Sequence, residues 1–222
     1  MRNLERLEKA HIPAPEVVLL RKHVLLMRFI GSVSTDGGSV ATAAPKLQEI
    51  GSKLKLSTQA RAYEQTTEIM KNMYQKAKLV HADLSEYNLL WHENKIWVID
   101  TAQAVEPQHP RALEFLYRDC QNITRYFGGK LGIKEVPNAR KLFVDVSMLD
   151  LDMEVSDQSY SDDLKADNSE EKTLFLAKIE EVQSRSLQHS QSKRGKADYQ
   201  KDLAKEDVIV GDDGEVIEIE KI

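Results

Sequence analysis

Three polar residues near the middle of the chain have the types and spacing that phosphoryl transfer requires. Asp83 is followed by Asn88 after four intervening residues, and Asp100 lies seventeen residues after Asp83. Phosphoryl transfer needs a carboxylate near the attacking hydroxyl, an amide oxygen on a Mg²⁺ ion, and a second carboxylate that joins this ion to the phosphates. The three side chains therefore predict a site where a proton acceptor meets two metal ligands.

The segment between Asn88 and Asp100 is expected to fold back on itself. Residues 89–91 and 96–99 are rich in Leu, Trp, Ile and Val, and the polar residues 92–95 separate them. Two short apolar runs around a polar turn are typical of a β-hairpin. This hairpin would return Asp100 to the side of Asn88, where both could bind one metal ion.

A metal-dependent hydrolase is an alternative interpretation of the same region. Its ligands would be His81, Asp83, Asp100 and His109. However, no second His-x-Asp pair and no His-x-x-x-His pair completes the ligand set that such a site needs. We therefore interpret His81 as a residue that orients the loop through hydrogen bonds, and His109 as a neighbour of the helix that begins at Pro110.

Hydrophobic periodicity predicts the elements that would position these residues. Apolar residues at helical spacing mark helices, and short apolar runs around polar turns mark hairpins. Residues 32–46 are rich in Ser, Thr, Gly and Ala, which predicts a flexible loop. The predicted helices are 1–10, 59–77 with Ser57 or Thr58 as its cap, 110–127, 139–146 and 168–182 with Asn168 as its cap; the other predicted hairpins are 17–27 and 208–219.

Length and composition indicate a globular protein. The chain has 222 residues, of which 41% are hydrophobic, so it can bury a core. No apolar run approaches the roughly 18 residues of a membrane span, which predicts no membrane segment. The one cysteine, Cys120, permits no internal disulfide and suits a reducing compartment, so we expect a cytoplasmic protein.

The charge is divided unevenly along the chain. Residues 1–150 carry 21 basic and 17 acidic residues, whereas residues 151–222 carry 10 basic and 19 acidic ones. The acidic C-terminal part is expected to stay solvated or to meet a basic partner. The small positive charge of the first part is not enough to predict nucleic-acid binding.

The residues around the predicted site resemble the RIO atypical protein kinases. His-x-Asp followed by Asn after four residues is the catalytic-loop pattern of protein kinases. The closer resemblance is carried by three blocks: His-Ala-Asp-Leu-Ser-Glu-Tyr-Asn, Trp-Val-Ile-Asp, and Val-Glu-Pro-Gln-His-Pro-Arg-Ala-Leu-Glu-Phe-Leu-Tyr-Arg-Asp-Cys. The chain is similar to the third RIO branch first and to the first branch second, over residues 3–130 and weakly near 174–182.

The resemblance implies an α+β, protein-kinase-like (RIO) fold, mainly the C-terminal lobe with the hinge and an incomplete N-terminal lobe. Residues 1–31 would be a remnant of the N-terminal lobe, comprising the end of its third helix, a hairpin and the hinge. Residues 32–150 would form the C-terminal lobe with the catalytic and metal-binding loops. An acidic linker and a final helix would occupy residues 151–183, and residues 184–222 would be a polar, mostly disordered tail.

The resemblance also implies roles for the three polar residues. Asp83 would be the proton acceptor, while Asn88 and Asp100 would hold Mg²⁺. Asp100 would itself accept a phosphate, which gives an aspartyl-phosphate intermediate. The implied partners are ATP, a protein substrate and pre-ribosomal small-subunit particles, because members of the family act in maturation of that subunit.

A nucleotide site is implied on the same grounds. Residues 27–30 match the adenine-binding hinge of the family, in which backbone groups of Arg28 and Ile30 would contact ATP. Leu90 matches the apolar floor under the base.

The sequence departs from the family pattern in two places. Residues 101–104 are Thr-Ala-Gln-Ala where the family usually has Val-Ser-Gln-Ser, a small change that keeps the metal ligand. The family's glycine-containing phosphate loop and its strand lysine would precede Met1, because the first glycine here is Gly31. We therefore expect an N-terminally truncated form whose 222 residues alone transfer phosphate poorly. Robust turnover of Mg-ATP that Asp83→Ala abolishes would contradict this expectation.

Two functional hypotheses follow from these observations. The first is an ATP-dependent serine/threonine kinase or ATPase. The second is a non-catalytic scaffold or binding module built on a remnant kinase lobe. Calorimetry with Mg-ATP separates them, because the second hypothesis predicts no nucleotide binding.

Overall fold

The computed structural model describes residues 1–34, 40–151, 153, 155, 159–160, 169–206, 208–210 and 216–218. The helices are α1 (Arg2–Lys9), α2 (Leu47–Ile50), α3 (Leu56–Asn72), α4 (Ala112–Thr124), α5 (Ala139–Ser147) and α7 (Ser169–Glu206). The strands are β1 (Val17–Arg21), β2 (Val24–Met27), β3 (Gly31–Ser34), β4 (Val40–Ala43), β5 (Leu89–His92), β6 (Lys95–Val98), β7 (Val208–Val210) and β8 (Val216–Glu218). They pair as antiparallel hairpins of consecutive strands, β1–β2 to β7–β8.

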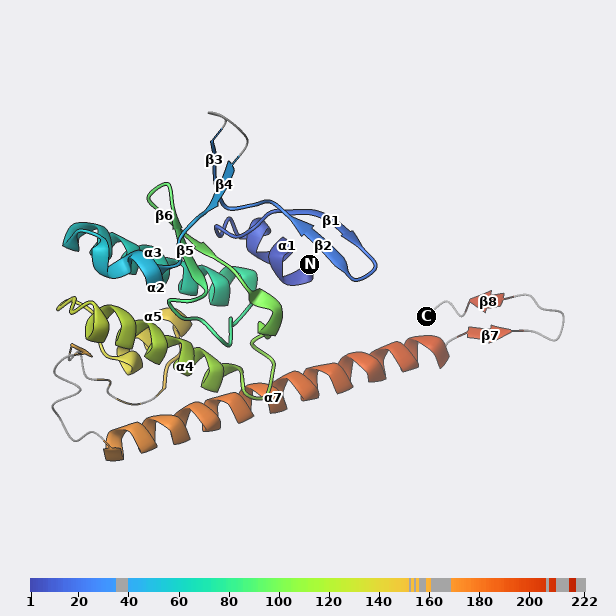
Figure 1. Ribbon diagram of the computed structural model, residues 1–222. Coiled ribbons are helices and arrows are strands. Elements are labelled where there is room, and N and C mark those ends of the chain that lie inside the picture. The colour runs from blue at the N-terminus through green and yellow to red at the C-terminus, as the bar shows by residue number, and fades with distance from the viewer. Residues whose placement is uncertain are drawn as a thin grey trace.

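The core lies between the helices α3, α4 and α5 and the β5–β6 hairpin, which packs on α3 (Figure 1). Three aromatic rings join α4, α5 and α7 at its centre. The Tyr117 ring centroid lies 5.1 Å from that of Phe175 and 6.1 Å from that of Phe143. The two phenylalanines are fully buried. This mixture of helices and separate hairpins confirms the α+β prediction.

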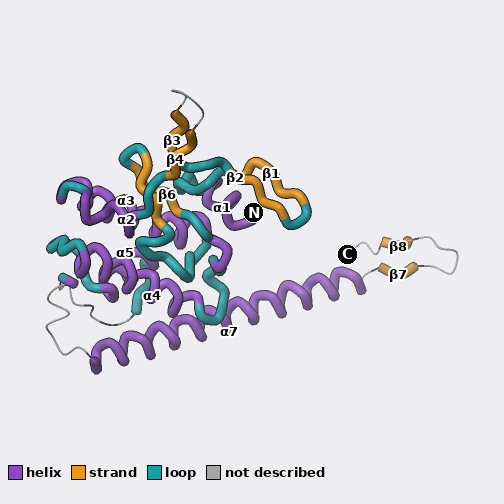
Figure 2. Tube along the Cα trace, viewed as in Figure 1, coloured by secondary structure: helices purple, strands orange, loops and turns teal. Residues whose placement is uncertain are grey.

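The chain after the hinge forms a hairpin, so the prediction of a flexible loop over residues 32–46 was wrong. Strands β3 and β4 pair in register and project from the body (Figure 2), while residues 35–39 lie outside the described part. Alternating Val and Ser or Thr residues suit a strand, which a compositional reading overlooks. The first residue of β3 is a glycine, Gly31, because a Cβ atom there would lie only 2.3 Å from the Thr42 carbonyl oxygen.

Helix α3 begins earlier than its sequence indicated. Lys55, rather than Ser57 or Thr58, is the N-cap residue, and its side chain forms no capping hydrogen bond. The buried side chains are Gln59, Ala62, Thr66, Ile69 and Met70. Gln59 and Thr66 donate hydrogen bonds to backbone carbonyls, which allows these two polar side chains to be buried.

Helix α7 continues to Glu206, well beyond the predicted end near residue 183. Its first half packs on the body, with Phe175, Ile179 and Gln183 buried. The spacing of apolar residues predicts that both Ile179 and Leu174 face the core; Ile179 does, whereas Leu174 is exposed. The Gln183 side chain accepts a hydrogen bond from the Leu113 N–H in the first turn of α4. Residues 184–206 were predicted to be disordered. They are rich in good helix formers, and a helix already nucleated on a core extends at little cost.

The C-terminal hairpin β7–β8 lies beyond the end of α7 and was predicted from its two short apolar runs (Figure 1). The expected capping residue Asn168 is outside the described residues. Within the described part of the chain, no helix has both the length and the apolar character needed to span a membrane.

Candidate active site

The β5–β6 hairpin places Asp100 beside Asn88, as the sequence indicated. Leu89 pairs with Val98 at the open end of the hairpin. The Ile99 N–H then donates a hydrogen bond of 3.0 Å to the Asn88 carbonyl oxygen. The residue immediately before Asp100 is therefore bound directly to Asn88.

The loop before β5 brings Asp83 to the same place. The side-chain nitrogen of Asn88, Nδ2, donates to the Asp83 backbone carbonyl oxygen at 2.8 Å and lies 3.4 Å from the Asp83 Oδ2 atom. Both acidic residues of the predicted site, Asp83 and Asp100, are exposed, and Asn88 is half-buried. Two carboxylates and one amide thus gather at the open end of a single hairpin, with their oxygens accessible.

His81 connects the loop that carries Asp83 to the segment that carries Asp100. Its side chain is 2% exposed, and Nε2 lies 3.1 Å from the Ile99 carbonyl oxygen. A carbonyl oxygen only accepts, so Nε2 carries the proton and donates it. Burial lowers the pKa of the imidazole, while the Ile99 carbonyl and the nearby Asp83 and Asp100 carboxylates oppose this shift. The His81 side chain thus connects the loop of Asp83 to the residue before Asp100.

The buried state of His81 makes stability depend on pH. The folded imidazole resists protonation while the unfolded one titrates near 6.5, so the unfolded chain binds the extra proton first. We expect the contribution of His81 to the free energy of unfolding to fall as the pH drops below about 6.5. Denaturant unfolding at several pH values should show a flatter dependence for His81→Gln, whose amide can still donate to Ile99. The exposed His23→Gln is the control, and parallel curves for wild type and His81→Gln would contradict the prediction.

Three polar residues of α4 hold the Asp83 loop by its backbone. The Asp119 carboxylate accepts hydrogen bonds from the N–H groups of Ala82 at 3.0 Å and Leu84 at 2.9 Å, on either side of Asp83. Arg118 donates to the Ala82 carbonyl oxygen at 2.9 Å. On the other side of Asp83, Asn122 donates to the Leu84 carbonyl oxygen at 3.1 Å. The backbone on both sides of Asp83 is therefore fixed.

Asp119 belongs to the third of the sequence blocks that resemble the RIO kinases, but no role was predicted for it. It is 1% exposed, and burial raises the pKa of its carboxyl to about 7 against the effect of the two N–H donors and of Arg118. A signal was present in the sequence. Asp119 lies on the apolar helix face that holds Leu116, Cys120 and Ile123, where a carboxylate needs polar partners.

The backbone of Asp100 is unusual. Its φ and ψ angles are 57° and 57°, in the left-handed region that non-glycine residues seldom adopt. Ala82, next to Asp83, also has a positive φ of 69°. Such conformations cost free energy and persist where the surrounding structure enforces them, often at functional sites. Here the hydrogen bonds of His81 and Asp119 provide that support.

Two adjoining hollows connect the hinge to Asp100. The first, about 660 Å³, is lined by residues 25–30, the segment 43–46 and Leu90. The second, about 620 Å³, is lined by the start of α1 and by Asp100 with its neighbours. Pro15, Leu25, Met27 and Ile99 line both hollows. Each volume is in the range of small-ligand pockets, and Asp83 lines neither.

The hinge has one free acceptor and one free donor. The Arg28 N–H donates to the Glu16 carbonyl oxygen at 2.8 Å, and the Ile30 carbonyl oxygen accepts from the Ala44 N–H at 3.0 Å. Across the described residues, no hydrogen bond engages the Arg28 carbonyl or the Ile30 N–H. One acceptor and one donor, two residues apart, suit the edge of a purine base. Leu90 faces the same hollow and is half-buried.

The donor set fits a hard cation better than zinc. Mg²⁺ takes oxygen ligands and is bound through one or two protein groups plus phosphate oxygens, which Asn88 and Asp100 can provide. No cluster of three or more His, Cys, Asp or Glu residues suited to a metal occurs among the described residues. His81 is engaged with Ile99, and His109 is exposed and stacks on Phe115. The hydrolase alternative therefore lacks its ligand set.

The fold and these features define a RIO domain, and the chain belongs to the RIO domain family. The family model for the RIO domain matches residues 1–141. The predicted family membership is thus confirmed.

Individual relatives agree with this assignment. The human serine/threonine-protein kinase RIO3 is 44% identical over 197 residues, which cover 89% of this chain and 33% of that protein. The human serine/threonine-protein kinase RIO1 is 46% identical over 127 residues, covering 57% of this chain and 21% of that protein. The predicted similarity to the third branch first and the first branch second is confirmed. The chain spans about a third of the length of its RIO3 relative.

Among solved structures, the chain is similar to the Rio2 kinase from Chaetomium thermophilum. The two are 18% identical, with a TM-score of 0.49, and the match covers 85% of this chain and 54% of that chain.

Proposed function

We propose that this chain carries the nucleotide- and metal-binding part of a RIO-type serine/threonine kinase or ATPase that transfers the γ-phosphate of ATP with Mg²⁺. The observation that carries the proposal is the meeting of Asp83, Asn88 and Asp100 at the open end of the β5–β6 hairpin. The identity to proteins named serine/threonine-protein kinases supports it.

The chain's own residues would divide the work as follows. Asp83, on a backbone fixed from both sides, would accept the proton of the attacking hydroxyl. Asn88 and Asp100 would hold Mg²⁺, which when bound supplies charge neutralisation at the phosphates. The carbonyl of Arg28 and the N–H of Ile30 would bind the adenine edge.

Asp100 would have a second role as the phosphate acceptor. One of its carboxylate oxygens would form a bond to the γ-phosphorus while the bond from this phosphorus to the bridging oxygen of the β-phosphate breaks and ADP leaves. The Asp100 side chain is exposed at the edge of the second hollow, which gives a phosphoryl group access to it. A protein substrate, pre-ribosomal small-subunit particles and a cytoplasmic location complete the proposal by family resemblance.

Nucleotide binding is the direct test, because it reports on the proposed site without depending on turnover. We expect calorimetry to show binding of Mg-ADP. Leu90→Asp places a charge on the floor of the base pocket and should weaken this binding about ten- to a hundredfold. Leu56→Asp is the control, since Leu56 is 66% exposed at the start of α3.

The scaffold hypothesis gives the opposite result. A folded wild-type chain that releases no heat with Mg-ADP and gains no thermal stability from it would favour a non-catalytic binding module. The acidic C-terminal part, residues 151–222, would then be the natural candidate for contact with a basic partner.

A further inference from the structure

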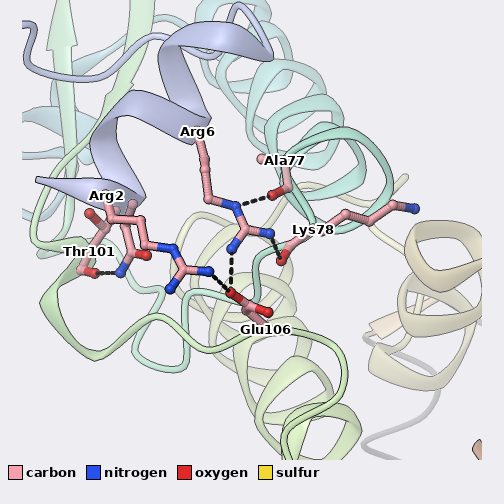
Figure 3. Close-up of polar contacts among 7 residues, drawn as sticks. Arg2, Arg6, Ala77, Lys78, Thr101 and Glu106 are labelled. Atoms are coloured by element: carbon pink, nitrogen blue, oxygen red, sulfur yellow. Dashed lines mark hydrogen bonds and ion pairs between the residues drawn. The ribbon is translucent and has the colours of Figure 1, made fainter. Parts of the chain in front are cut away.

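Helix α1 places one guanidinium between two loops of the site (Figure 3). The Arg6 Nε atom donates to the Ala77 carbonyl oxygen at 2.9 Å, and Nη2 donates to the Lys78 carbonyl oxygen at 2.8 Å. Its Nη1 atom donates to Glu106 Oε1 at 2.8 Å. Three of the five N–H donors of Arg6 therefore bind acceptors in two segments, residues 77–78 and Glu106, which lie about 30 residues apart in the sequence.

The two segments lead directly into the site. Lys78 ends the helical region before His81 and Asp83, while Glu106 closes the segment that follows Asp100. They are joined between these points by a reciprocal pair of hydrogen bonds, from the Val80 N–H to the Val105 carbonyl oxygen at 2.8 Å and back at 2.9 Å. Arg6 spans the outer end of this bridge.

A second contact from α1 reaches the metal loop itself. The Asn3 side-chain nitrogen donates to the Thr101 carbonyl oxygen at 2.9 Å, one residue after Asp100. Arg2 also donates to Glu106 Oε1, at 2.7 Å. Figure 3 shows the Arg2 and Arg6 side chains reaching from α1 toward Glu106.

The environment separates Arg6 from Arg2. The Arg6 side chain is 23% exposed, and it serves carbonyls at the end of a helix that have no partner within the helix. The Arg2 side chain is 80% exposed and forms an ion pair with Glu106. An exposed ion pair contributes little, whereas a planar fork that serves three acceptors at once cannot be replaced by a lysine ammonium.

We propose that Arg6 is a positioning residue that sets the spacing between the loop of Asp83 and the loop of Asp100, with Asn3 supporting the metal loop. A shift of helix α1 would thereby shift Asp100, the proposed metal ligand. The proposal rests on the proposed function for its effect on Mg²⁺, while the geometry of the two loops can be measured independently.

The test uses Arg6→Lys, which keeps the charge and removes the fork. Arg111→Lys is the control, because Arg111 is an exposed arginine whose fork pairs with Glu114 away from both hollows. The affinity for ADP is measured by calorimetry in Mg²⁺ and in EDTA. We expect Arg6→Lys to lose about tenfold of the gain in ADP affinity that Mg²⁺ gives, because hydrogen bonds that involve a charged group are lost. Its ADP affinity in EDTA should stay at the wild-type value, and Arg111→Lys should match wild type in both.

Amide hydrogen exchange provides a readout that needs no nucleotide. The Val80 and Val105 amides bridge the two loops, so they should exchange faster in Arg6→Lys than in wild type or Arg111→Lys. Wild-type exchange together with a wild-type Mg²⁺ effect would overturn the proposal. A general loss of stability, which would weaken ADP binding in EDTA too, would also count against a positioning role. If the wild-type chain shows no Mg²⁺ effect, the proposed function fails, and the exchange rates still decide whether Arg6 sets the spacing.

Discussion

Asp119→Ala is expected to cause the largest loss of stability of any single substitution at the site. The change leaves the buried N–H groups of Ala82 and Leu84 without their acceptor. An unsatisfied buried donor costs about 1–3 kcal/mol, so the free energy of unfolding should fall by about 2–6 kcal/mol. Because whole domains are stable by only about 5–15 kcal/mol, the alanine variant is expected to fold poorly.

Asp119→Asn is the more informative variant. Its amide has one oxygen for the two N–H groups, and its NH₂ would face the other donor. We expect the free energy of unfolding to fall by about 1–3 kcal/mol, measured by urea denaturation. Asp145→Asn is the control: Asp145 forms an i,i+4 ion pair with Lys141 on α5, and the loss there should be about 0.5 kcal/mol or less. Equal losses for the two asparagine variants would show that Asp119 does not hold the loop.

The contrast between Asp119 and Asp83 shows which parts of a site can be predicted from sequence. Asp83, Asn88 and Asp100 lie within one short stretch, and the hairpin between them has a local pattern. Their proximity could therefore be predicted. Asp119 acts on residues 35 and 37 positions away, and no local pattern encodes that contact.

The same reasoning applies to α1. The polar residues of this helix look like an ordinary solvated face, because only its apolar residues, Leu4 and Leu7, repeat at helical spacing. Arg6 and Asn3 find their partners 71 to 100 residues further along the chain. Long-range polar contacts depend on the assembled fold, which periodicity does not describe.

Boundaries show a third kind of error. Composition alone made residues 32–46 a loop and residues 184–206 a disordered tail, whereas the structure has a hairpin in the first and most of a helix in the second. In the second region polar residues extend a helix that the packed half of α7 has already nucleated. In the first region the alternation of Val with Ser or Thr suits a strand.

Asp100→Asn is expected to have the largest effect on ligand binding. The substitution keeps the size of the side chain and one oxygen, but it removes the negative charge that a hard divalent cation requires. Changes to residues that merely support a metal ligand cost about 10–100-fold in affinity. Loss of the ligand's charge should therefore remove the whole gain in ADP affinity that Mg²⁺ gives, while ADP binding in EDTA is unchanged or slightly stronger.

Asp83→Asn is the partner experiment, because it separates the two acidic roles. Asp83 contacts the Asn88 side chain but is not one of the two proposed Mg²⁺ ligands, so its charge should matter for proton acceptance and little for Mg²⁺. Calorimetry should therefore show a nearly full Mg²⁺ effect in Asp83→Asn and none in Asp100→Asn. Glu93→Gln, on the turn of the same hairpin and with a side chain 79% exposed, is the control. If Asp83→Asn abolished the Mg²⁺ effect as completely as Asp100→Asn, the two carboxylates would share the metal, and the assignment of Asp83 as the proton acceptor would be wrong.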